Sequence, residues 1–176
     1  MQDKKWMVAD KIPAEIEKSL GEFPPILRQL VFNRGIRDAD AARRYLSPTE
    51  DEIHDPFRLL QMEAAVGRIL EAVERGEKIA IYGDYDVDGV TAAALLVQVL
   101  RRMGAEVEHY IPDRHSEGYG INCEALSKLK NEGYSLVVSV DCGVRSRQEA
   151  EFAQQIGLEL IITDHHEPGE HVPEAV

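Results

Sequence analysis

Four short runs of β-favouring apolar residues, separated by stretches of helical pattern, constrain the fold of this chain most. The runs cover 78–82, 107–111, 136–140 and 158–163, and each is followed by polar residues. Strand and helix alternating at this spacing predict a parallel sheet with helices on both faces. The sequence therefore indicates an α/β class, with a Rossmann-like sheet, over residues 77–176.

Helices are expected between these strands. The patterns place them over 90–103, over 124–130 behind an Asn122 cap, and from residue 147 to just before Gly157. Ser146 followed three residues later by Glu149 has the pattern of a capping box for the last of them.

The first 76 residues contain only helical patterns. Short helices are expected at 26–33 and 39–46, and a longer one at 60–75 that Gly76 ends. No catalytic pattern occurs here, so residues 1–76 are interpreted as a helical lead-in.

The net charge of −12 is distributed unevenly along the chain. Residues 1–76 carry a net −2, whereas residues 77–176 carry −10 together with five of the six histidines. This balance argues against binding nucleic acid through a broad basic surface in this part of the chain. Acid and histidine concentrated together indicate either a metal site or a solvated acidic surface.

Membrane and secretory signals are lacking in the sequence. No apolar run reaches the roughly 18 residues that span a bilayer, and the first ten residues lack the apolar core of a signal peptide. Two cysteines form no disulfide framework, which fits a reducing compartment. We expect a cytoplasmic protein without a membrane partner.

Polar residues with metal-binding chemistry follow each predicted strand, where open α/β sheets place their sites. They are Asp84, Asp86 and Asp88 after the first strand, 113–119 after the second, Asp141 after the third, and Asp164, His165 and His166 after the fourth.

The three alternate aspartates after the first strand would repel one another without a cation between them. The pattern also opens an EF-hand loop, but that loop needs a Glu at its twelfth position, where this chain has Leu95, and a helix rather than a strand before it. A solvated acidic turn is the remaining alternative. For Asp141 the alternative is a helix cap, and for the histidines a solvated loop.

Carboxylates together with imidazole suit Mn²⁺ or Mg²⁺. So many carboxylates indicate two cations bridged by one of them, an arrangement that activates water for phosphoryl hydrolysis. Cys123 and Cys142 lack the spacing of a zinc site. In the loop after the second strand, Arg114 and His115 offer phosphate contacts and Tyr119 a face for a base, with a glycine-containing structural turn as the alternative.

These motifs resemble the DHH phosphoesterase superfamily. The triplet at 164–166, DYDVDGVT at 84–91, PDRHSEGYGI at 112–121 and VDCGV at 140–144 are similar to the RecJ branch. The resemblance implies a Mn²⁺- or Mg²⁺-dependent exonuclease that degrades single-stranded DNA in the 5′ to 3′ direction during recombination and repair.

The resemblance also implies a role for each matched residue. Asp86 and Asp84 would serve a first metal, Asp88 and His165 a second, and Asp141 would bridge the two.

Other matched residues would support or contact substrate. His166 and Asp164 would be supporting or substrate-facing groups, with His166 counted among the catalytic residues, while Arg114, His115 and Tyr119 would contact the substrate.

The resemblance further implies parts that would follow Val176: another metal-binding Asp, a second domain and an OB-fold. We therefore expect an N-terminal piece, weak or inactive alone, whose single-stranded DNA is held mainly by those parts. A single-stranded-DNA-binding protein and a helicase are the expected partners. The alternatives are a DHH hydrolase acting on oligoribonucleotides, cyclic dinucleotides or pyrophosphate, and a non-catalytic DHH scaffold.

Overall fold

The computed structural model describes residues 6–49 and 53–175, which divide into two compact units between Asp55 and Pro56. The first unit contains α1 (Ala14–Ser19), α2 (Pro25–Phe32) and α3 (Ala39–Leu46). Ile12, Leu20, Val31 and Ala42 form its small buried core.

Two of these three helices match the sequence prediction. The α2 helix opens at a proline, and α3 begins where the Asp38 carboxylate accepts the Ala41 N–H at 2.8 Å. The α1 helix, only 6 residues long, was not expected.

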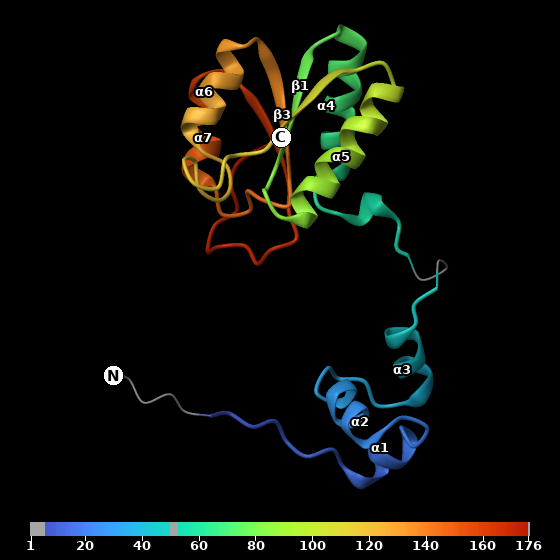
Figure 1. Ribbon diagram of the computed structural model, residues 1–176. Coiled ribbons are helices and arrows are strands. Elements are labelled where there is room, and N and C mark those ends of the chain that lie inside the picture. The colour runs from blue at the N-terminus through green and yellow to red at the C-terminus, as the bar shows by residue number, and fades with distance from the viewer. Residues whose placement is uncertain (1–5, 50–52, 176) are drawn as a thin grey trace. The chain divides into compact units, whose positions relative to one another are not determined.

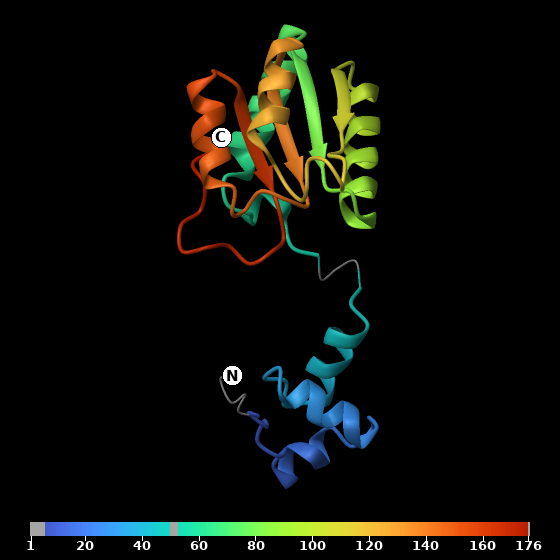
Figure 2. The same ribbon diagram turned by 60° about the vertical axis from the view of Figure 1, so that its left-hand side comes forward.

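The second unit is built around a four-stranded parallel sheet with the order β2-β1-β3-β4. Figure 2 shows its strands pointing in the same direction. Its elements in chain order are η2 (Pro56–Arg58), α4 (Met62–Arg75), β1 (Lys78–Gly83), α5 (Val87–Arg102), β2 (Glu106–Tyr110), α6 (Cys123–Asn131), β3 (Tyr134–Val140), α7 (Arg147–Gln155) and β4 (Glu159–Thr163).

Helices cover both faces of this sheet, as the sequence predicted. In Figure 1, α4 and α5 lie on one face, and α6 and α7 on the other. Each face has its own apolar core: Ile79, Ile81 and Val138 belong to the first, and Leu126 and Val137 to the second. Burying both faces explains why the strands read as continuous apolar runs.

The helix α4 belongs to this unit rather than to the preceding helices. Ala72 of α4 is fully buried in the core that also contains Ile79 and Leu136. The compact units therefore divide before η2, at Asp55–Pro56, and not at residue 76 where the sequence placed the end of the lead-in.

The start of α5 and the cap of α7 differ from the sequence prediction. The α5 helix begins at Val87, three residues early, because the Asp86 carboxylate accepts the N–H groups of Asp88 and Gly89. The capping box at Ser146 is wrong: this residue adopts φ −85° and ψ 56° instead of an extended conformation, and its side chain accepts no bond from α7.

Within residues 6–49 and 53–175, no helix combines the length and the apolar character needed to cross a bilayer.

Candidate metal centre

The carboxyl ends of the four strands meet at one edge of the sheet. The strand register pairs Gly83 with Val140 and Val140 with Thr163, so β1, β3 and β4 end side by side. Asp84, Asp141 and Asp164 each follow one of these strand ends directly. This register is what brings residues from separate parts of the chain to one place.

A first group of ligand atoms comes from Asp84, Asp86 and Asp141, whose oxygens lie within 4.8 Å of one another. Asp84 is only 1% exposed, and its burial raises the pKa of its carboxyl. Three carboxylates this close repel one another unless a cation lies between them.

A second group comes from Asp141, His165 and His166, again with ligand atoms within 4.8 Å. Nε2 of His165 lies 2.9 Å from Oδ1 of Asp141. Asp141 is therefore common to both groups.

Asp88 lies beside these groups without joining either of them. It belongs to the first turn of α5 and borders a hollow of about 470 Å³. The other residues that line the hollow are Ala92, Val140, Asp141, Thr163, Asp164 and His165.

Two buried oxygens test whether these residues fit a cation. Oδ2 of Asp84 and Oδ1 of Asp141 receive no hydrogen bond, the latter despite its close approach to His165. A buried carboxylate oxygen without a donor is costly, and a hard divalent cation satisfies it directly. The donor set, carboxylate oxygens with imidazole nitrogens, fits Mn²⁺ or Mg²⁺.

The backbone around Asp84 is packed too tightly for side chains. A Cβ on Gly89 would lie 2.4 Å from the Asp84 nitrogen, and one on Gly83 would lie 2.8 Å from the Gly89 oxygen. Asp141 adopts a positive φ of 62°, which turns the chain sharply after β3. These glycines let the start of α5 approach the end of β1 closely.

Asp164 fixes the orientation of His166. Its Oδ1 lies 2.7 Å from Nδ1 of His166, and its Oδ2 accepts the Val144 N–H at 3.0 Å. Burial alone would raise the pKa of Asp164, but these hydrogen bonds hold it below its ordinary value. The Asp164 carboxylate in turn raises the pKa of His166.

The two cysteines do not form a zinc site. Cys142 is 1% exposed, and its burial raises the pKa of its thiol to about 12. The thiol therefore stays protonated, which disfavours metal binding. Cys123 is half-buried at the start of α6, and both cysteines are free.

The loop after β2 places Arg114 and Tyr119 near these ligands. Cζ of Arg114 lies 5.3 Å from the centre of the Tyr85 ring. The Tyr85 and Tyr119 rings meet edge to face at 6.1 Å, and Tyr119 meets His166 in the same way at 6.5 Å. A row of cationic and aromatic groups therefore leads from the loop to the second ligand group.

His115 is not brought to this row. It is exposed, and among the described residues its imidazole makes no hydrogen bond, whereas its backbone N–H donates to Oδ1 of Asp113.

Tyr85 belongs to the site but was not predicted there, although its place between Asp84 and Asp86 is a signal for it. Tyr82 and Glu117 were not predicted either. The bond of Tyr82 to the loop joins distant segments, whereas Glu117 lies in the loop and bonds to the nearby Asp113 and Tyr110.

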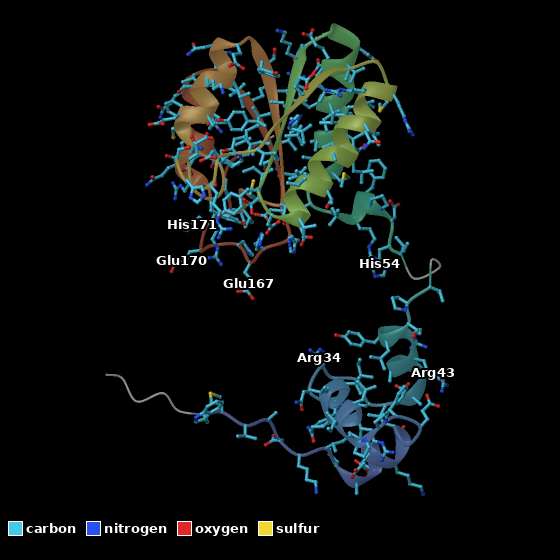
Figure 3. All side chains as sticks on the ribbon, in the orientation of Figure 1. Arg34, Arg43, His54, Glu167, Glu170 and His171 are labelled. Atoms are coloured by element: carbon cyan, nitrogen blue, oxygen red, sulfur yellow. The ribbon has the colours of Figure 1, made fainter. Side chains whose placement is uncertain are left out.

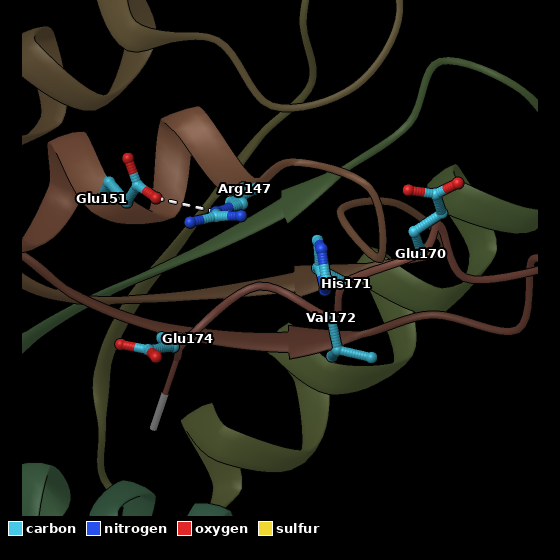
Figure 4. A pocket seen from close by; sticks show the side chains of 6 residues that line it. All are labelled: Arg147, Glu151, Glu170, His171, Val172 and Glu174. Carbon is cyan, nitrogen blue, oxygen red and sulfur yellow. Dashed lines mark hydrogen bonds and ion pairs between the residues drawn. The ribbon is translucent and has the colours of Figure 1, made fainter.

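A separate hollow of about 540 Å³ lies between α7 and the tail that follows β4. Figure 4 shows its lining residues, with Arg147 and Glu151 paired at 2.8 Å. Figure 3 places Glu167, Glu170 and His171 on that tail. None of the predicted metal or substrate residues lines this hollow.

Fold and site together define an α/β domain with a candidate carboxylate–imidazole metal centre at the carboxyl edge of its sheet. The family model described as "DHH family, N-terminal domain" matches residues 78–176. The chain belongs to the DHH family.

Two relatives of this chain are RecJ exonucleases. The single-stranded-DNA-specific exonuclease RecJ of Bacillus subtilis is 42% identical over 96% of this chain and 23% of its own length. Its Escherichia coli counterpart is 35% identical over 88% of this chain and 26% of its own length. The chain thus spans about a quarter of the length of these relatives.

Two solved structures agree. The crystal structure of exonuclease RecJ bound to manganese matches with a TM-score of 0.62 and 38% identity, covering 66% of this chain and 30% of the other. RecJ from Thermus thermophilus in complex with Mn²⁺ matches with a TM-score of 0.65 and 30% identity, covering 99% of this chain and 25% of the other. Both confirm the predicted fold, and both contain the metal that the sequence reading proposed.

Proposed function

We propose that this chain provides the metal-binding part of a nuclease that hydrolyses phosphodiester bonds of single-stranded DNA in the 5′ to 3′ direction. One observation carries the proposal: Asp141 belongs to two ligand groups at once, beside a loop that offers a guanidinium and an exposed tyrosine. The names of the relatives support the choice of substrate.

In this proposal Asp84 and Asp86 would hold one cation, Asp88 and His165 would hold the other, and Asp141, which is common to both ligand groups, would serve both. A metal pair lowers the pKa of a bound water and stabilises charge on the leaving oxygen.

The chain's own side chains then position the substrate. Arg114 can hold a phosphate with its two-pronged guanidinium, and Tyr119, 57% exposed, can stack on a base. Asp164 engages Nδ1 of His166 at 2.7 Å, which leaves Nε2 as the ring nitrogen available to the substrate.

Charge limits how much of the DNA this part holds alone. Residues 77–176 carry a net −10, so a broad grip on the phosphate backbone must come from elsewhere in a longer protein. We therefore expect weak or no cleavage by the 176 residues alone. A role in recombination and repair in the cytoplasm, with a helicase and a single-stranded-DNA-binding protein, completes the proposal.

A chimera tests this function. This chain would replace the matching segment of the Bacillus subtilis relative, and the product would be incubated with Mn²⁺ and single-stranded DNA labelled at either end. We expect stepwise release of the 5′ label, and its loss when the chimera also carries Asp141→Asn. The unaltered relative serves as the positive control.

Other substrates distinguish the alternatives. Hydrolysis of dinucleotides, cyclic dinucleotides or pyrophosphate without cleavage of DNA would replace the proposal with another DHH hydrolase. A chimera that folds and binds Mn²⁺ but cleaves nothing would favour a scaffold.

A further inference from the structure

Two tyrosines stack at the carboxyl ends of neighbouring strands. Tyr82 of β1 and Tyr110 of β2 are register partners, and their rings lie 5.1 Å apart at an interplanar angle of 24°. Tyr82 is fully buried and Tyr110 is half-buried. Each hydroxyl points to one end of the loop that carries Arg114 and Tyr119.

The Tyr82 hydroxyl fixes the end of this loop. It donates to the Gly120 oxygen at 2.9 Å and accepts from Nδ2 of Asn122 at 3.2 Å. Gly120 directly follows Tyr119 in the chain, so this bond holds the backbone beside the exposed ring.

The Tyr110 hydroxyl fixes the beginning of the loop through Glu117. It donates to Oε1 of Glu117 at 2.5 Å, while Oε2 of Glu117 accepts the Asp113 N–H at 2.8 Å. Glu117 therefore uses both carboxylate oxygens, one to reach β2 and one to hold the residue before Arg114.

We infer that three positioning residues, Tyr82, Tyr110 and Glu117, form a clamp that holds the loop 113–120 beside the metal centre. By holding this loop, the clamp sets the affinity of the protein for single-stranded DNA. The inference rests on the proposed function, since it concerns the same substrate. None of the three clamp residues belongs to either ligand group. The clamp acts on affinity through Arg114 and Tyr119, and leaves metal binding alone.

The clamp is tested in the 176-residue chain with Tyr110→Phe and Glu117→Gln. The first removes one hydroxyl but keeps the stacked ring. The second replaces one of the two accepting carboxylate oxygens with an NH₂ group, which donates instead of accepting. We expect amide hydrogen exchange in 113–120 to rise about tenfold in each variant, as for the loss of one hydrogen bond to a charged group.

Binding measurements separate positioning from general damage. In the chimera with the Bacillus subtilis relative, the same substitutions should lower the affinity for a fluorescent single-stranded oligonucleotide in Mn²⁺ by about five- to tenfold, with Mn²⁺ affinity unchanged. The double variant should lose less than the sum of the two single losses, because both changes break one shared contact.

Matched controls come from the other end of the sheet. Tyr134→Phe alters a half-buried tyrosine at the start of β3, and Glu106→Gln alters an exposed glutamate at the start of β2 that pairs with Lys78 at 3.6 Å. Neither should change loop exchange or oligonucleotide affinity.

The outcomes separate the two claims. A chimera without clamp substitutions that binds Mn²⁺ but no oligonucleotide would contradict the proposed function and, with it, the clamp's role in substrate affinity. Binding by this chimera that the clamp variants retain in full would overturn the clamp alone, as would equal losses in the matched controls.

Discussion

Gly89 decides how closely the first turn of α5 approaches Asp84. A Cβ at this position would lie 2.4 Å from the Asp84 nitrogen and 2.5 Å from its oxygen, both backbone atoms that cannot rotate away. The close approach places the buried Asp84 carboxylate beside Asp86, the residue that caps the helix.

Gly89→Ala should therefore destabilise the protein, by about 1–3 kcal/mol, the usual cost of forcing extra atoms into a packed site. In urea unfolding, this loss of stability lowers the urea concentration at the midpoint and leaves the slope of the free energy against urea concentration unchanged. Gly67→Ala is the control, because Gly67 lies inside α4 with nothing within 4 Å of its added Cβ. That change should stabilise the protein by about 0.5–1 kcal/mol through helix propensity. A Gly89→Ala chain as stable as the wild type would contradict the close approach of Gly89 to Asp84.

At the scale of the element, helix caps show what the sequence could and could not predict. Asn122 and Asp38 cap helices as their types suggest, because an extended residue before a helix presents its side-chain oxygen to the first free N–H groups. Ser146 has an equally good pattern but caps nothing, because its backbone lies in a turn in which its N–H donates to the Gly143 oxygen at 2.9 Å.

Alanine substitution distinguishes the Asn122 cap from Ser146, whose side chain caps nothing. Asn122→Ala should lower the free energy of unfolding by about 1–2 kcal/mol, because Oδ1 of Asn122 accepts the Ala125 N–H at 2.7 Å and Nδ2 also bonds to Tyr82. Ser146→Ala should change it by less than about 0.5 kcal/mol. Equal losses in chemical denaturation would contradict the observed absence of a Ser146 cap.

The Glu117 link between β2 and its loop predicts a dependence on pH. The Asp113 N–H and the Tyr110 hydroxyl lower the pKa of Glu117 below its ordinary 4.5. A lowered folded-state pKa contributes stability that is complete above the unfolded value and is lost as the pH falls through the folded value. The free energy of unfolding of the wild type should therefore exceed that of Glu117→Gln by about 1–2 kcal/mol at pH 7. This difference should shrink below about pH 4.5. A difference that stays constant down to pH 3 would contradict this contribution.

At the scale of the whole molecule, the α/β fold and the edge that carries the site follow from alternation and strand ends alone. Four apolar runs with acidic or histidine ends predict where Asp84, Asp141 and His165 lie, because parallel strands end together. The register decides the rest. No local pattern predicts that Tyr82 lies against Tyr110 or that α4 packs on the sheet through Ala72. Both contacts depend on pairing between distant segments of the chain.

Mn²⁺ should stabilise the second unit as a whole. A free cation at about 100 times its Kd adds about 2.7 kcal/mol per site, which raises the Tm by roughly 10 °C for one site in a unit of this size. Differential scanning calorimetry would detect the shift, with Glu170→Gln as a control outside the ligand groups. An unchanged melting curve in saturating Mn²⁺ would count against a preformed centre.

The shared ligand Asp141 is tested most directly by calorimetric titration of Mn²⁺ into the wild type, Asp84→Asn and Asp141→Asn. Asparagine suits Asp141 because it tolerates the positive φ of 62° that an alanine would strain. Asp141→Asn should remove Mn²⁺ binding more completely than Asp84→Asn, since Asp141 belongs to both ligand groups and Asp84 to one. Wild-type Mn²⁺ affinity in Asp141→Asn would contradict the account.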